Sequence, residues 1–364
     1  MKTLNLYVTK EFCITLLLSI GVLTFALLGA NMLKVFKLLA EGVTVFDAMK
    51  FLFNIMPSVL GLGIPWAILV AVMLVFGKMS ADNEITAMRA CGISIMQIIS
   101  PIILIVFLLT ILCLWLQLEI GPVTKLKARQ IGRNVVMSNP MSMFQPGEEL
   151  PIDNMRVTIG EIDEKGNLKD VQIYVMSKDG SALKDDIQAK RGVLKVDKRK
   201  EVIYMTLFDV AIVRYDFETG QPYRWFSTTW THPIKYGEES NKKNLQKKIS
   251  FLPIEQLFAR AVLDSKRGLP TAPVELELHR RLTLGLSPIA FLLLGLPLAI
   301  RTSRRETSLG LLISVALAGL FLALVMIFRS MSQHPEYHPE LLIWLPNVVY
   351  QVCGIYFIYR IAKR

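Results

Sequence analysis

Residues that could carry out catalysis are few in this 364-residue sequence, and their spacing argues against an enzyme. The stretch HPEYHPE places His334 and His338 four residues apart, but its two prolines prevent the regular helix that would bring both rings to one metal ion. The sequence contains no G-x-x-x-x-G-K-[ST] loop, no H-E-x-x-H pair and no G-x-S-x-G turn. We therefore predict a protein that holds no metal or cofactor and does not hydrolyse nucleotides itself.

A short capped helix is predicted within GKMSADNEITAMRACGIS, a stretch that separates two long hydrophobic runs. Ser80 is a suitable N-cap residue, and the carboxylate of Glu84 near the first turn complements the positive end of the helix. Gly92 is a suitable residue just beyond the C-terminal end. These signals predict a helix over about residues 81–91.

The two faces of this helix differ. Helical spacing groups Ala81, Ile85, Met88 and Gly92 on one face, beside a polar stripe of Asp82, Thr86 and Arg89. These residues leave two interpretations open. The helix transmits force from a soluble partner to the adjoining spans, as coupling helices of ATPase-driven transporters do, or it is a capped turn that packs only on its own protein.

The surrounding sequence is that of a membrane protein. It is 52% hydrophobic, with a mean hydropathy of +0.44. Six runs are long enough to cross a bilayer as helices: about 12–33, 54–76, 97–118, 282–300, 308–328 and 341–359. The net charge of +11 is explained by basic residues that flank these runs, so nucleic-acid binding is not predicted.

Charge in the short segments predicts the orientation in the membrane. One set of segments carries Lys2, Lys10, Lys78, Arg89, Arg301, Arg304, Arg305, Arg360, Lys363 and Arg364. The other set carries Lys34, Lys37, Lys50 and Arg329, with Arg280 and Arg281 just before the fourth run. Basic residues favour the cytoplasmic side, so both termini are predicted to be cytoplasmic and the insert at about 122–275 to lie outside the inner membrane.

The insert is predicted to be an antiparallel β domain. Segments such as MRVTIGEI, VQIYVMS and EVIYMTLFDVAIVRYD are rich in β-forming residues and are separated by turn signals. A helix is predicted at 253–268. The predicted fold is a membrane α-helical protein in which six spans (3+3) flank a β-jelly-roll or sandwich domain. Its parts are residues 1–121, 122–275 and 276–364.

The predicted spans contain no Asp, Glu, Lys, Arg or His. Because ion and proton pathways use such groups, a proton-coupled transporter is not favoured, and energy for transport must come from a partner. Cys13, Cys91, Cys113 and Cys353 all lie in or beside hydrophobic runs, without zinc spacing or a disulfide framework.

Two motifs and the layout resemble the lipopolysaccharide export permeases, the LptF/LptG family. Glu84, Met88, Ala90 and Gly92 match the family pattern of the segment after the second span. The stretch ELHRRLTLGLSPIAFLLLGLPLAI resembles the start of the family's fourth span. The arrangement of three spans, a β insert and three spans covers the whole chain, and the Cys91-Gly92 ending is closer to the F-type subunit than to the G-type.

The resemblance implies a transport subunit of the bacterial inner membrane. Two such permeases pair, recruit a cytoplasmic LptB-like ATPase dimer and extract lipopolysaccharide, which jelly-roll domains pass to a periplasmic bridge protein. By resemblance, the ATPase-coupling residues would be Glu84, Ile85, Met88, Arg89, Ala90 and Gly92.

Substrate contacts are predicted at the outer end of the first span. Lys34 and Lys37 are three residues apart, which places them on one helical face where a lipid with phosphorylated sugars needs cations. The alternative is that both lysines only snorkel to the membrane surface. Lys125, Arg129 and Arg133 follow the third span at helical spacing and could add a basic rim.

Two other functions remain open from the sequence. One is a different ATPase-coupled permease for lipids or lipoproteins, which a topology map would distinguish because such permeases usually have fewer spans. The other is a membrane scaffold that uses its β domain for docking and transports nothing. A substrate-stimulated ATPase assay on the complex would separate that scaffold from a transporter.

Overall fold

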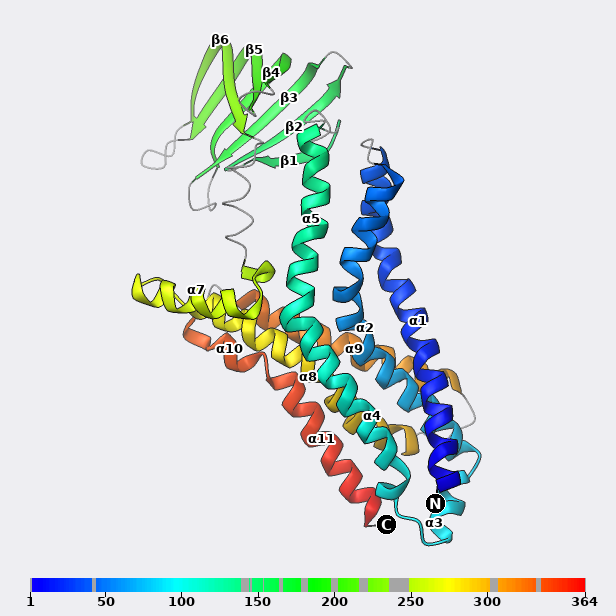
Figure 1. Cartoon of the computed structure of the whole chain (residues 1–364). Coiled ribbons are helices and arrows are strands. Elements are labelled where there is room, and N and C mark those ends of the chain that lie inside the picture. Colours follow the sequence, from blue (N-terminus) through cyan, green and yellow to red (C-terminus); the bar gives the residue numbers. More distant parts are fainter. Residues whose placement is uncertain are drawn as a thin grey trace. The chain divides into compact units, whose positions relative to one another are not determined.

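The computed structural model places most of the chain (Figure 1). It describes residues 2–40, 44–138, 144, 146–152, 154–163, 166–177, 183–197, 202–215, 222–235, 249–301, 307–331 and 335–363. Two compact units are present. A helical unit comprises Met1–Phe36, Met49–Ala128 and Lys248–Arg364, and a second unit with the β strands comprises Lys37–Ala48 and Arg129–Lys247.

Six spans long and apolar enough to cross a membrane are present in the described residues, three before the strands and three after them, as predicted. They are formed by α1 (Lys2–Ala40), α2 (Val45–Ala81), α4 (Ile95–Trp115) continuing into α5 (Gly121–Ser138), α8 (Ala272–Arg301), α9 (Thr307–Ser330), and α10 (Pro339–Leu342) followed by α11 (Leu345–Ala362). The predicted helix at 253–268 is confirmed as α7 (Ile254–Lys266).

Helix α8 is the most enclosed part of the helical unit, together with α2, and it contacts α4, α7, α9, α10 and α11. Small residues allow these close approaches. A Cβ atom on Gly354 of α11 would lie 2.5 Å from the backbone carbonyl carbon of Leu293 in α8. A Cβ atom on Gly285 of α8 would lie 2.5 Å from the Leu114 side chain of α4. Larger residues would push both helices away from α8.

Other spans expose apolar side chains, as helices facing lipid do. Phe25 of α1 is 78% exposed, and α4, α9 and α11 each carry several large apolar residues on their outer faces. Prolines at Pro57 and Pro65 of α2 and at Pro288 and Pro297 of α8 lie inside continuous helices. Helices α2 and α8 therefore continue through their internal prolines.

The third span is longer than predicted. A π-helical segment (Leu116–Ile120) joins α4 to α5, which extends to Ser138, so the helix passes well beyond the predicted boundary at residue 122. The first strand begins at Glu149. Gln117 donates a hydrogen bond from Nε2 to the carbonyl oxygen of Gly61 in α2 at 3.2 Å, which holds the π segment against its neighbour.

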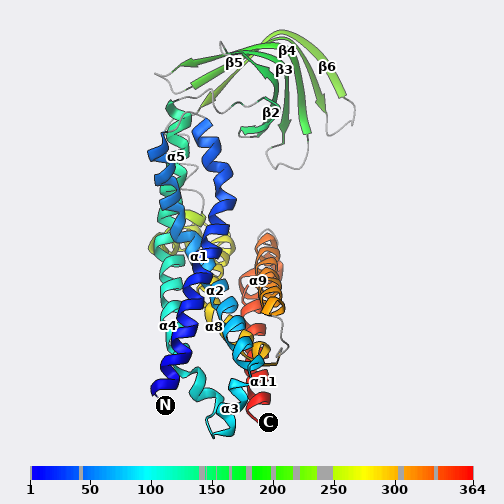
Figure 2. The ribbon, with the colours of Figure 1, turned by 90° about the vertical axis from the view of Figure 1, so that its right-hand side faces the viewer.

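The predicted β insert is confirmed as a six-stranded antiparallel sheet. Its strands pair in sequential order: β1 (Glu149–Ile152), β2 (Met155–Ile162), β3 (Asn167–Met176), β4 (Leu183–Asp197), β5 (Val202–Tyr215) and β6 (Pro222–Lys235). The described strands form one curved sheet (Figure 2), whereas a sandwich or jelly roll divides its strands between two sheets. Turn signals in the sequence locate strands, but they do not say which strands pair.

Apolar and polar residues alternate along the strands, so one face of the sheet is apolar and buried. In β2, Met155, Val157 and Ile159 enter an apolar cluster that continues through β3, β4 and β5. On the surface, Lys169 and Glu161 pair across β2 and β3 at 2.8 Å, and the ammonium group lowers the pKa of the Glu161 carboxyl.

Candidate functional site

The predicted coupling segment folds as a helix shorter than expected. Helix α3 (Glu84–Ala90) has Asn83 at its N-cap in the left-handed conformation, with φ 60° and ψ 14°. The prediction that Ser80 caps it is wrong, because α2 continues to Ala81 and includes Ser80. The Ser80 hydroxyl instead donates a hydrogen bond to the carbonyl oxygen of Ile300 in α8, at 2.8 Å.

The C-terminal end of α3 is a Schellman motif, as the position of Gly92 predicts. Gly92 adopts a positive φ of 83°, and its N–H donates to the carbonyl oxygen of Arg89 at 2.9 Å. The Ile93 N–H donates to the carbonyl oxygen of Met88 at 3.1 Å. Gly92 thus ends the helix and redirects the chain toward α4, whose first turn has a capping box built by Ser94 and Gln97.

The two faces of α3 have different surroundings. Ile85 and Met88 are buried in the apolar core of the helical unit, at 5% and 9% exposure. Glu84 is partly buried, and both of its carboxylate oxygens accept hydrogen bonds from the Tyr7 hydroxyl of α1, at 3.2 and 3.3 Å. By contrast, Arg89 and Ala90 are exposed. The apolar face therefore packs on its own protein and the polar face is free for a partner.

The predicted substrate residues lie on two long helices. Lys34 of α1 is exposed, and its Nζ donates to Asn31 Oδ1 at 3.3 Å. Lys37 lies one helical turn further along α1, and Arg133 lies in α5, but the side chains of both fall outside the described residues. Lys34 is assigned to the helical unit, whereas Lys37 and Arg133 are assigned to the second unit.

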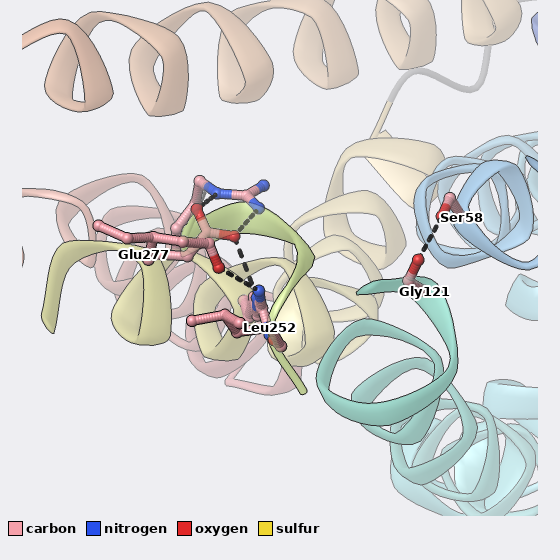
Figure 3. A network of polar contacts seen from close by, with 7 residues as sticks. Ser58, Gly121, Leu252 and Glu277 are labelled. Carbon is pink, nitrogen blue, oxygen red and sulfur yellow. Dashed lines mark hydrogen bonds and ion pairs between the residues drawn. The ribbon is translucent and has the colours of Figure 1, made fainter. Parts of the chain in front are cut away.

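A buried ion network at the start of α8 was not predicted. Glu277 accepts two hydrogen bonds from Arg280, at 2.9 and 2.7 Å, and one from Arg281 Nε at 3.0 Å. Arg281, only 1% exposed, also donates to the carbonyl oxygens of Leu252 at 2.7 Å and Ile249 at 3.3 Å. Figure 3 shows the Glu277 carboxylate between two guanidinium groups, beside the Leu252 carbonyl.

This network fixes the chain where it returns to the membrane. The carbonyls that Arg281 binds belong to η3 (Ile249–Phe251) and to the residue that follows it, just before α7. The sequence signal was the spacing of Glu277 from Arg280 and Arg281, three and four residues apart on a helix. In the sequence, these arginines stand out as basic residues just before the fourth predicted span.

Basic side chains gather near this network. Lys125 of α5 interacts electrostatically with Arg280, Glu277 and Arg281 of α8 and with Arg329 of α9. Figure 3 also shows the junction that positions α5, where the Ser58 hydroxyl of α2 donates to the carbonyl oxygen of Gly121 at 3.3 Å. One predicted member of the basic rim, Lys125, therefore lies near three arginines and one carboxylate of α8 and α9.

The fold defines a multi-pass membrane protein with six spans and a β-sheet insert. Comparison with family models matches residues 6–360 to the lipopolysaccharide export system permease LptF/LptG. The chain therefore belongs to the LptF/LptG family. Members of this family are transmembrane transport subunits of the lipopolysaccharide export system, in which LptB is the ATPase. A search of curated proteins found no match.

Proposed function

We propose that this permease crosses the inner membrane with both termini and α3 in the cytoplasm and with its β sheet in the periplasm. Both termini and α3 lie at the same end of the helical unit (Figures 1 and 2). The short segments at that end carry most of the basic residues that flank spans, which supports a cytoplasmic location.

Helix α3 is the proposed docking element for a cytoplasmic LptB-like ATPase dimer. Its exposed face offers Arg89, Ala90 and the turn at Gly92 to the partner, with Glu84 at the edge of that face. Ile85 and Met88 contribute by anchoring the helix in the permease core, which refines the direct contact that the resemblance implied for them. The F-type assignment, from the Cys91-Gly92 ending, stays part of this proposal.

The coupling proposal rests on one observation, that α3 is attached both to α1 and to the apolar core of the helical unit. The Tyr7–Glu84 hydrogen bonds tie its first turn to α1, and the burial of Ile85 and Met88 ties its inner face to the core. A helix that only filled a loop between spans would not need contacts with a segment 77 residues away. A push on α3 from outside is therefore transmitted to the spans.

Lipopolysaccharide is the proposed substrate of this permease, and cationic groups at the end of the spans opposite α3 are proposed to bind it. Lys34, Lys37 and Arg133 would contact its phosphates, because ammonium and guanidinium groups form charge-assisted hydrogen bonds with phosphate oxygens. Lys125 and Arg329, which are both exposed, support this choice, since they extend the positive charge along the helical unit.

Family membership supports the proposal of two further partners. A second permease of the same family would pair with this one through apolar helix faces that the chain leaves exposed. A periplasmic bridge protein would add a strand to the sheet at β6, with which no described strand other than β5 pairs. Tyr223, Trp225 and Phe226 of β6 are exposed and would give that contact its apolar part.

Affinity purification of the tagged chain from bacterial membranes tests this assembly. We expect an ATPase and a second permease of the same family to co-purify with it. The detergent extract of a strain with untagged chain is the control for non-specific capture. Recovery of the second permease without any ATPase would contradict the proposed coupling, and recovery of neither would contradict the proposed assembly.

A further inference from the structure

A pocket at the α3 end of the helical unit is lined by arginines from three separate helices. Arg89 comes from α3, Arg301 from the last turn of α8 and Arg360 from the last turn of α11. The pocket has a volume of about 220 Å³. Its remaining walls are apolar and consist of Pro297, Leu298, Ile300, Phe357 and Ile361.

The three guanidinium groups have no acidic partner within the described part of the chain. None of them forms an ion pair there, although other arginines of the molecule, such as Arg214 and Arg281, do so. Three like charges on one small, partly apolar hollow repel one another, and an anion between them would offset this repulsion. The pocket is therefore complementary to a group that is negatively charged at one end and apolar at the other.

We propose that this pocket binds the phosphate of an anionic phospholipid in the leaflet that faces α3. Guanidinium groups bind phosphate oxygens in a bidentate manner, and basic pockets between membrane helices on the cytoplasmic side hold such head groups. The apolar walls take the first part of the acyl chains. Beyond them, α11 exposes Val352, Ile355 and Tyr356, along which the chains would continue.

The position of the arginines favours a lipid over an acidic side chain of the ATPase. The fourth span ends at Arg301 and the last span ends at Ile361, next to Arg360, so two of the three charges lie at the level of the lipid head groups. Pro297 and Phe357, which line the pocket, are themselves residues of these spans.

Occupation of the pocket would connect the docking helix to the spans by a second route. Arg89 belongs to α3, whereas Arg301 and Arg360 belong to α8 and α11, so a shared phosphate restrains α3 relative to both helices. This consequence rests on the proposed coupling role of α3, but the binding of lipid does not. Anionic lipid is thus a proposed regulator of the coupling between ATP hydrolysis and transport.

The test is a titration of the purified full-length permease complex in detergent with fluorescent phosphatidylglycerol. The Arg301→Gln/Arg360→Gln double variant is compared with the Lys10→Gln/Lys78→Gln variant, which removes two exposed charges that do not line the pocket. A membrane-surface arginine contributes about fivefold in affinity, so we expect roughly 25-fold weaker binding for the first variant and less than twofold change for the second. Equal melting temperatures and matched yields establish that both variants are folded.

Each outcome supports or overturns the proposal. Unchanged affinity of the double variant for phosphatidylglycerol overturns it. Equally tight binding of phosphatidylcholine or of glycerol phosphate also overturns it, because the site then selects no anionic head group or needs no acyl chain. Loss of the ATPase from the double variant with unchanged lipid affinity identifies an acidic partner residue as the occupant. The coupling proposal and the lipid proposal can fail independently. A Glu84→Lys variant that keeps its ATPase would contradict the coupling proposal but would leave the lipid affinity of the pocket untested.

Discussion

The hydroxyl of Tyr7 in α1 donates hydrogen bonds to both carboxylate oxygens of Glu84 in α3, at 3.2 and 3.3 Å. On the inner side of the same helix, Ile85 and Met88 share an apolar core with Val8 and Phe12 of α1. The first span and α3 are therefore joined by a polar contact at the surface and by apolar packing beneath it. This junction gives α3 a mechanical connection to the spans.

Removing only the Tyr7 hydroxyl tests the polar half of this junction. We expect Tyr7→Phe to change the free energy of unfolding by less than about 1 kcal/mol, because the bond is exposed. The ATPase should stay bound, but its stimulation by lipopolysaccharide should fall by up to about fivefold, the equivalent of one such bond. Tyr215→Phe, at an exposed tyrosine of β5, is the matched control. Equal stimulation in both variants would show that the contact is not used in coupling.

Charge reversal tests the proposed substrate lysines. The Lys34→Glu/Lys37→Glu variant should assemble normally and lose most of the lipopolysaccharide-stimulated ATPase activity, because carboxylates would then repel the phosphates of the lipid. Lys190→Glu/Lys195→Glu reverses two exposed charges on β4 and should behave as the unmodified chain. Stimulation and export that survive the first variant would leave Lys34 and Lys37 as snorkelling residues only.

The buried network at the start of α8 predicts an unequal effect of two neighbouring arginines. Arg281→Met leaves a buried carboxylate with one partner and two carbonyl groups without their donor, so we expect a loss of about 3 kcal/mol in stability. Arg280→Met is the control, because Glu277 keeps Arg281, and its loss should be about 1 kcal/mol. Thermal unfolding of the purified proteins measures both, and equal losses would mean that Arg281 does not fix the returning chain.

The orientation predicts which thiols are accessible from each side. A cysteine placed at the exposed Asn167, the first residue of β3, should react with a membrane-impermeant maleimide in cells whose outer membrane alone is permeable. Cys91, exposed at the end of α3, should react only after the inner membrane is disrupted, so it is an internal control. A Cys91→Ser background isolates the Asn167→Cys signal. Labelling of Asn167→Cys from the cytoplasmic side alone would reverse the topology.

Much of the fold could be predicted because its signals are local. Long apolar runs identify six spans, and alternation with turn residues identifies the strands. Gly92 was correctly placed because the end of a helix in this geometry requires a positive φ. The family motif around Glu84 is local in the same sense, since it lies within one short segment.

The parts that could not be predicted depend on contacts between distant residues. Serine is a residue type that often caps helices, but Ser80 lies inside α2. Its hydroxyl donates a hydrogen bond there to the carbonyl oxygen of Ile300, which is 220 residues away in the sequence. The apolar face of α3 was read as a docking surface, and only the structure shows that Ile85 and Met88 are covered by their own protein. Arg281 donates to backbone carbonyls of η3 and Leu252. Because every residue has such a carbonyl, the pattern of side chains in the sequence does not indicate which ones Arg281 binds.

The central claim is that α3 docks the ATPase, and the Glu84→Lys substitution tests it most directly. A lysine there loses the favourable interaction with the helix N-terminus, about 0.3–1 kcal/mol, and places a like charge against any basic group of the partner. The measurement is the amount of ATPase that co-purifies with the variant, at membrane levels matched to the unmodified chain. Coupling through α3 predicts a normally inserted permease that fails to retain or stimulate the ATPase. A variant that holds its ATPase and exports lipopolysaccharide normally would contradict the claim and leave α3 as a capped turn between two spans.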